Sequence, residues 1–235
     1  MSIADNIQRV QETITAACAR VGRDPAAVTL IAVSKTHPAA LVLEAAAAGV
    51  QHFGENRVEE AESKIPQVNV VVTWHMIGHI QSRKAKDVPP LFNVVHSVDR
   101  LKLADKLARA VTERGGTLDA LLEINISGEE SKGGLPAFGW QTDPAVRAAV
   151  WEEVRQICAL PGLNVRGLMT MAPIVPDMQA ARPVFAGLRE LRDRLAESLG
   201  LPLPDLSMGM TDDYPVAVEE GATLVRIGRA IFGER

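Results

Sequence analysis

The 235-residue sequence predicts an α/β protein, a single (β/α)8 TIM barrel with an extra N-terminal helix. Three features predict this fold: short apolar segments recur eight times, helical stretches separate them, and the connections are short. This alternation fits either a closed barrel or an open doubly wound sheet. A Rossmann sheet would usually show GxGxxG after its first strand and an acidic residue ending its second, and the sequence shows neither. We therefore expect residues 1–235 to form one barrel domain.

The first element is an amphipathic helix. Ser2 is a good N-cap residue, and the apolar residues that follow it recur at helical spacing: Ile3, Ile7, Val10, Ile14 and Ala17. The mixture of charged and apolar residues in this segment is typical neither of a signal peptide nor of a membrane span.

The barrel elements follow in alternation. The apolar runs predict parallel strands at 30–34, 52–54, 69–77, 93–98, 118–126, 165–169, 205–209 and 223–228. Helical patterns predict longer helices at 38–48, 101–114, 145–159 and 178–199, with shorter ones near Val58, Arg83 and Tyr214. The least regular segment, 128–144, predicts a long loop after the fifth strand.

Composition narrows the classes of partner. The chain is 47% hydrophobic and 23% charged, its net charge is -4, and its pI is near 5.8. An acidic protein has no general attraction for nucleic acid or anionic lipid, so neither partner is expected. Cys18 and Cys158 lie in separate helical patterns without CxxC spacing, which predicts buried thiols in a reducing compartment and a cytoplasmic location.

In a TIM barrel the functional site lies at the carboxyl ends of the strands. Residues at these positions should therefore face one mouth: Lys35, Asn56, His75, His79, His96, Ser97, Asn125, Ser127, Met169, Met171, Ser207, Gly209, Met210, Arg226, Gly228 and Arg229. Lys35 ends the first strand, where low-dielectric walls would lower the pKa of its amine as a Schiff-base lysine requires. The alternative for Lys35 is a solvated lysine that simply ends a strand.

The last two loops predict an anion site. Phosphate in TIM barrels often binds between the loops after strands seven and eight, which here read SMGMTDD (207–213) and RIGRAIFG (226–233). Their glycines would let backbone amides approach an anion, although they could serve only turns. Asp212 and Asp213 are interpreted as caps of the following helix. Arg226 lies within a strand and needs a partner wherever it points.

Two other signals are weak. His75 and His79 have the spacing of a helical zinc pair, but Gly78 and the preceding strand favour a turn, so no metal site is predicted. The segment GEESKGGL does not match a P-loop.

Eight motifs in order along nearly the whole chain resemble the pyridoxal phosphate homeostasis protein family, which is similar to the N-terminal barrel of alanine racemase. They are AVSKTHP (32–38), FGENR (53–57), WHMIGHIQSRKAK (74–86), HSVDR (96–100), INISGEESKGG (124–134), GLMTMAP (167–173), LSMGMTDD (206–213) and VRIGRAIFG (225–233). The resemblance implies a protein that holds pyridoxal 5′-phosphate (PLP), the active form of vitamin B6, without catalytic turnover.

The resemblance also implies roles for individual residues. Lys35 matches the lysine that forms the Schiff base with PLP, and Arg226 matches the arginine that faces the pyridine nitrogen. The phosphate would be held by Ser207, Gly209, Gly228 and Arg229, and the ring would lie near Asn56, His75, Ser97 and Met210. The chain departs from the usual family residues at Arg57, Met76, Arg83, Thr211 and Arg229, where the family commonly has Tyr, Phe, Asn, Ser and Thr.

Three functions compete. The first is a PLP carrier, expected to be a monomer that serves apo PLP-dependent enzymes. The second is a PLP-dependent amino-acid racemase, which normally gains a second, β-rich domain and a tyrosine base, whereas this chain ends soon after its eighth strand and has one tyrosine, Tyr214. The third is an aldolase whose lysine reacts with a sugar-phosphate substrate and no cofactor.

Overall fold

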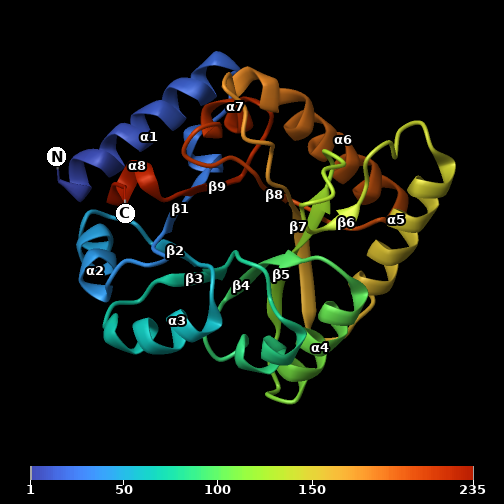
Figure 1. Cartoon of the computed structure of the whole chain (residues 1–235), viewed down its shortest axis with the longest axis horizontal. Coiled ribbons are helices and arrows are strands. Elements are labelled where there is room, and N and C mark those ends of the chain that lie inside the picture. The colour runs from blue at the N-terminus through green and yellow to red at the C-terminus, as the bar shows by residue number, and fades with distance from the viewer. Residues whose placement is uncertain (1, 235) are drawn as a thin grey trace.

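The computed structural model describes residues 2–234 and contains a closed parallel barrel of eight strands (Figure 1). The barrel strands are β1 (Thr29–Val33), β2 (His52–Glu55), β3 (Thr73–Met76), β4 (Val94–Val98), β5 (Leu118–Asn125), β7 (Leu163–Met169), β8 (Asp205–Ser207) and β9 (Leu224–Ile227). Pairing of β1 with β9 and of β4 with β5 closes the ring. The predicted fold class and all eight strands are confirmed.

The helices surround the barrel as the alternating pattern predicts (Figure 1). They are α1 (Ile3–Arg20), α2 (Ala39–Ala47), α3 (Val58–Lys64), α4 (Leu101–Thr112), α5 (Pro144–Cys158), α6 (Arg182–Leu199), α7 (Tyr214–Glu219) and α8 (Arg229–Phe232). The turn near Arg83 is a 3-10 helix, Ser82–Asp87, and another 3-10 turn, Met178–Ala181, precedes α6.

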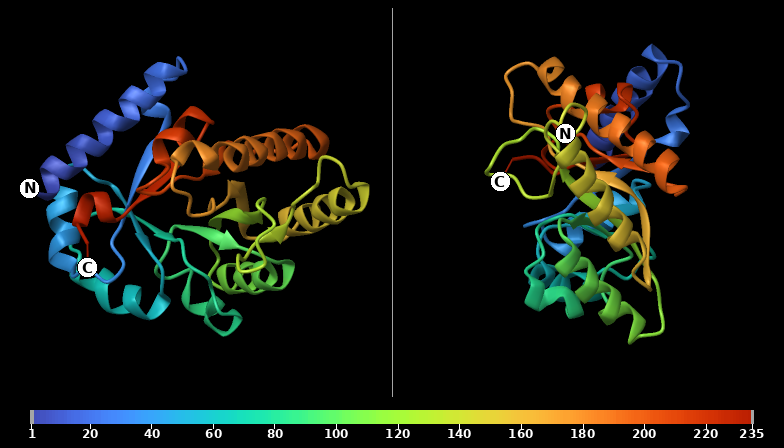
Figure 2. Two further views of the ribbon diagram at one scale, coloured as in Figure 1. Left: turned by 45° about the horizontal axis from the view of Figure 1, so that its top comes forward. Right: turned by 90° about the vertical axis from the view of Figure 1, so that its right-hand side faces the viewer.

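The N-terminal helix lies against the last two helices of the chain, as the left view of Figure 2 shows in blue and red. Ser2 caps α1 through a capping box with Asp5. The Asn6 amide donates to the Ile231 carbonyl of α8 at 2.7 Å, and Arg20 pairs with Glu219 of α7. The N-terminal helix α1 therefore lies beside the C-terminal helices α7 and α8.

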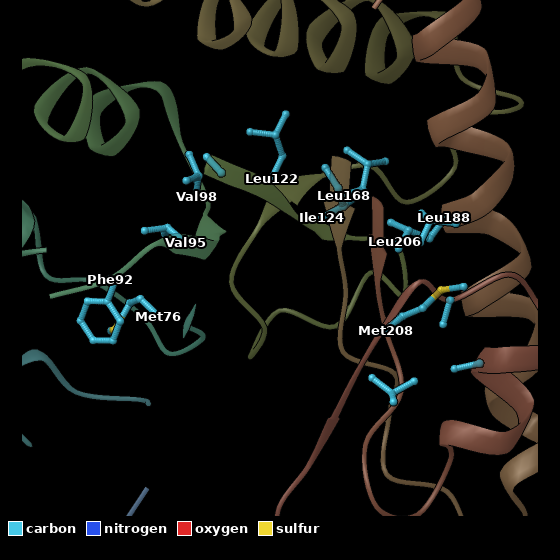
Figure 3. Packing of buried hydrophobic residues seen from close by; sticks show 14 of the residues in the cluster. Met76, Phe92, Val95, Val98, Leu122, Ile124, Leu168, Leu188, Leu206 and Met208 are labelled. Carbon is cyan, nitrogen blue, oxygen red and sulfur yellow. The ribbon is translucent and has the colours of Figure 1, made fainter. Parts of the chain in front are cut away.

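Alternate residues of each strand face two different cores. Outward residues pack against the helices; in Figure 3, Leu206 of β8 lies close to Leu188 of α6. Inward residues form a smaller apolar cluster from β1, β5, β7 and β9, made of Ile31, Leu121, Met169 and Leu224. Beyond this cluster, several inward positions of the strands are polar.

Several boundaries differ from the sequence predictions. The third strand begins at Thr73 rather than 69, because Val70 and Val71 are exposed and bury nothing against the barrel. The 128–144 segment contains a two-residue strand, β6 (Leu135–Pro136), which pairs with β5. Cys18 is fully buried as predicted, whereas Cys158 is only partly buried. In residues 2–234 no helix is long and apolar enough to cross a membrane.

Candidate functional site

A cleft of about 610 Å3 opens at the carboxyl ends of β1, β2, β8 and β9. Six of the ten residues predicted for the site line it: Lys35, Asn56, Met210, Arg226, Gly228 and Arg229. They come from segments far apart in the sequence, which the barrel brings to one mouth. A hollow with a cationic lining at this end of a TIM barrel is suited to an anionic ligand.

Lys35 follows β1 by two residues and is half-buried in the cleft. The backbone changes direction directly after it, because Thr36 has a φ of 67°. A threonine in this left-handed region is disfavoured by its β-branched side chain, so surrounding contacts must hold it there.

A buried ionic cluster beneath Lys35 supplies these contacts. Lys64 Nζ of α3 donates to the Ser34 carbonyl at 2.7 Å, to Glu55 Oε1 at 2.6 Å and to Glu60 Oε1 at 2.7 Å. The same Glu60 oxygen accepts from the Thr36 amide. The cluster therefore hydrogen-bonds to the backbone of Ser34 and of Thr36, on both sides of Lys35. Burial raises the pKa of Glu55, although hydrogen bonds from Lys64 and Ser34 oppose the shift.

Arg226 is a buried cation on the inward face of β9, only 4% exposed. Its guanidinium donates to the Thr170 carbonyl at 2.9 Å, to the Ser207 carbonyl at 2.9 Å and to Ser207 Oγ. Burial lowers its pKa to about 10, while Asp213 and Glu123 act in the opposite direction. The side chain therefore remains charged at neutral pH and borders the cleft in a fixed orientation.

Four predicted site residues do not line the cleft. Ser207 is fully buried, and its hydroxyl lies 2.8 Å from His96 Nδ1 as well as accepting from Arg226. His75 is buried beside His96, at 2.8 Å. The Ser97 hydroxyl donates to the Gly78 carbonyl at 2.6 Å. Gly209 has a φ of 95° and packs closely against α7.

The two loops predicted to hold an anion meet at the rim. Arg229 forms an exposed ion pair with Asp212, so this carboxylate links the loops instead of capping α7. Asp213 occupies the N-cap position of α7 but its side chain makes no capping bond to that helix; Oδ1 accepts from the Met210 amide at 2.6 Å. The predicted N-cap position of Asp213 is therefore confirmed, but its carboxylate closes the loop before the helix, and the predicted capping role of Asp212 is wrong because that carboxylate pairs with Arg229.

The structure adds residues to the cleft that were not among the predicted ligand-binding residues, notably Thr211 and His37. His37 also stacks at 5.0 Å between ring centroids on Phe232 of α8. The signal for Thr211 was present, since it lies within the loop proposed for an anion. His37 follows the end of β1, a position that carries no separate pattern.

Glu123 is a second titratable group near Arg226. It is 6% exposed on the inward face of β5, and burial, reinforced by Asp99, raises its pKa to about 7. Among residues 2–234, no three histidine, cysteine or acidic side chains converge in a way that could hold a metal ion.

Known proteins that resemble this chain over its whole length fall into one family. The family model "Alanine racemase, N-terminal domain" matches residues 2–235. The chain is 45% identical to the "Pyridoxal phosphate homeostasis protein" of Pseudomonas aeruginosa, covering 100% of this chain and 96% of that one. The structure of PipY of Synechococcus elongatus with PLP bound superposes with a TM-score of 0.83 at 36% identity, over 99% of this chain and 100% of that chain.

An alanine racemase of Clostridium difficile shares the fold alone, with a TM-score of 0.70 at 13% identity over 98% of this chain and 57% of that chain. The chain belongs to the alanine racemase N-terminal domain family and, within it, to the pyridoxal phosphate homeostasis proteins.

Proposed function

We propose that this protein binds PLP in the cleft and takes part in intracellular PLP homeostasis by holding the cofactor without catalytic turnover. The observation that carries the proposal is the placement of Lys35, Arg226 and the two glycine-containing loops around one cleft. The name of the Pseudomonas relative and the PLP in the PipY structure support the same ligand.

The residues present are suited to PLP. Lys35 would hold its aldehyde as a Schiff base, and Arg226 would face the ring nitrogen. Thr211, Gly228 and Arg229 would hold the phosphate, because they line the cleft where the two glycine-containing loops meet. Asn56 and Met210 would flank the ring. Bound PLP supplies an electrophilic carbonyl and an electron-accepting ring.

In this proposal Ser207 does not touch the phosphate directly. Its hydroxyl and carbonyl both accept from Arg226, so it orients the guanidinium. His75 lies behind Ser207 through His96 and would act through the same contact.

Two features of the proposed site support the absence of turnover. A guanidinium is a donor only, so Arg226 would leave the ring nitrogen unprotonated and the ring a weaker electron sink. Racemisation would then need an acid and a base on opposite faces. The only tyrosine of the sequence, Tyr214, is 7% exposed within the hydrophobic core and does not belong to the residues that line the cleft.

The binding proposal is tested by trapping. The protein should be yellow when saturated with PLP, and borohydride should fix the cofactor to Lys35, as seen by peptide mass spectrometry. Lys35→Ala should lose both the visible band and the adduct, whereas Lys86→Ala, at an exposed lysine, should keep them. An unchanged band in Lys35→Ala would show that the attachment site is elsewhere.

The absence of turnover is tested with amino acids. The PLP-loaded protein is incubated with L-alanine and other amino acids, and enantiomer ratios are followed by chiral chromatography beside an apo PLP-dependent enzyme. We expect reactivation of that enzyme without racemisation. Racemisation at about one turnover per second or faster would identify an enzyme instead.

A further inference from the structure

Three histidines form a hydrogen-bonded row across the barrel interior, one from each of β2, β3 and β4. His52 Nδ1 lies 3.0 Å from His75 Nε2, and His75 Nδ1 lies 2.8 Å from His96 Nε2. His96 Nδ1 lies 2.8 Å from Ser207 Oγ, which accepts from Arg226. The row therefore ends on the guanidinium that borders the cleft.

A guanidinium can only donate, so the Ser207 hydroxyl accepts from Arg226 and keeps its own proton for a second partner. Among residues 2–234, the other side-chain atom within hydrogen-bonding distance of this hydroxyl is His96 Nδ1, at 2.8 Å, and we assign the proton to that bond. His96 then carries its proton on Nε2 and donates to His75 Nδ1. By the same step His75 donates from Nε2 to His52 Nδ1.

The three imidazole rings are neutral in this arrangement, and the burial of the rings favours the neutral form. Burial lowers the pKa of His75 to about 3 and that of His96 well below its usual value, and the charge of Arg226 adds to the shift at His96. Burial also lowers the pKa of the more accessible His52. No ring then brings a second buried positive charge beside Arg226.

We propose that His96 is a positioning residue, which orients the Ser207 hydroxyl and thereby holds Arg226 toward the bound ligand. His75 and His52 in turn hold His96 through their hydrogen bonds. This inference rests on the proposed function for its ligand, PLP, but the hydrogen-bond direction belongs to the protein alone. If His96 is removed, the Ser207 hydroxyl loses its acceptor and can turn away from the geometry that receives Arg226.

The row also connects two faces of the barrel. His52 is partly exposed and borders a separate hollow of about 510 Å3 at the amino ends of β1 and β2, beside α1. The cleft that contains Arg226 lies at the opposite, carboxyl ends of the strands. The hydrogen-bonded row therefore extends from this hollow to the proposed PLP site.

The first test uses the unliganded protein. Long-range 1H–15N spectra of 15N-histidine-labelled wild-type protein should show His75 and His96 as neutral rings protonated on Nε2 between about pH 6 and pH 8. An Nδ1 proton on either ring, or a cationic ring, would overturn the proposed direction. This result does not depend on PLP binding.

The second test compares variants with PLP. His96→Leu removes the acceptor at nearly constant volume and should raise the Kd for PLP about tenfold, with a shifted visible band. His96→Asn can still accept near the Nδ1 position and should recover a Kd within about threefold of wild type. His75→Leu should lie between them.

Met169→Leu is the matched control, because this residue is equally buried inside the barrel and is paired with Ser207 across β7 and β8, but it supplies none of the hydrogen bonds of the row. Equal Kd values and spectra for His96→Leu and Met169→Leu would overturn the positioning role. If wild-type protein itself binds no PLP, the proposed function fails, while the tautomer spectra still decide the hydrogen-bond direction.

Discussion

Glu123 carries a buried carboxyl whose protonation should be visible in the stability of the protein. Its folded-state pKa of about 7 lies above the ordinary value of 4.5 because of burial. Between these two values the folded protein holds a proton that the unfolded chain has lost. The contribution of Glu123 to stability therefore falls as pH rises through this window, by at most about 1.4 kcal/mol per pH unit.

Glu123→Gln should remove this decline. In urea unfolding at several pH values, the variant should gain stability relative to wild type from about pH 5 to pH 7, and the difference should level off above pH 7. Shifts common to both proteins cancel in the comparison. Parallel stability curves would mean that Glu123 is not protonated in the folded protein near neutral pH.

The cluster around Lys64 predicts a large loss of stability when its cation is removed. Lys64→Met leaves Glu55 and Glu60 without the ammonium that joins them, and breaking a buried ion pair in this way typically costs about 3–5 kcal/mol. Lys84→Met is the control, because Lys84 pairs with exposed Glu59 and should cost less than about 1 kcal/mol. Urea unfolding measures both, and equal losses would contradict the structural role of the cluster.

Arg229 should discriminate between PLP and its unphosphorylated form. Because charge-assisted hydrogen bonds to phosphate are strong, wild-type protein should bind pyridoxal far more weakly than PLP. Arg229→Ala should weaken PLP binding about tenfold and leave pyridoxal binding unchanged. Fluorescence titrations with both ligands test this, and equal weakening for both would remove Arg229 from the proposed phosphate site.

The sequence located the mouth of the barrel but not the depth of each residue within it. Lys35 and Arg226 were predictable because strand-end positions and family motifs agree. Ser207 and His75 also occupy strand ends, yet hydrogen bonds among inward-facing side chains place them below the cleft. These contacts join residues 21 to 111 positions apart, and no local pattern encodes such pairs.

At the scale of elements, Gly209 sets the distance between the end of β8 and α7. Its φ of 95° disfavours any other residue, and an added Cβ would lie 2.6 Å from the Ala217 Cβ and 2.9 Å from the Tyr214 Cα. Gly209→Ala should therefore cost about 2 kcal/mol or more, because backbone strain and a clash act together.

Gly200→Ala provides the comparison in the same urea experiment. Gly200 ends α6 with a φ of 64°, but a Cβ there meets no atom within 4 Å. Its substitution should cost about 1 kcal/mol from backbone strain alone. A loss at Gly209 no larger than the loss at Gly200 would show that α7 moves away without difficulty.

Strand prediction succeeded where apolar runs are buried and failed where they are not. The apolar runs of β1, β4 and β5 place apolar side chains on both faces of a buried parallel strand, so the runs alone were enough to predict these strands. The residues before β3 are equally β-branched, but Val71 is completely exposed. The two residues of β6 are too few to leave a periodic signal.

At the scale of the whole molecule, the exposed apolar side chains predict a monomer. Val71, Phe138 and Ile174 are the most exposed large apolar residues described, and they belong to three different loops. Single exposed side chains on separate loops do not by themselves supply the continuous apolar core that a stable dimer interface needs. Light scattering after size exclusion should give about the chain mass of 25.3 kDa, with or without PLP, whereas twice that mass would reveal a dimer.

Closure of the barrel also limits how another protein can approach. All eight barrel strands have two neighbours, so none presents a row of unpaired amides and carbonyls. Outside the ring, in residues 2–234, the sheet continues only as β6, where Pro136 has no amide hydrogen to offer. Recruitment by strand addition requires such a free edge. In residues 2–234 the closed ring therefore offers a partner protein loops and helices to recognise, and no barrel strand to which a β-strand of that partner could be added.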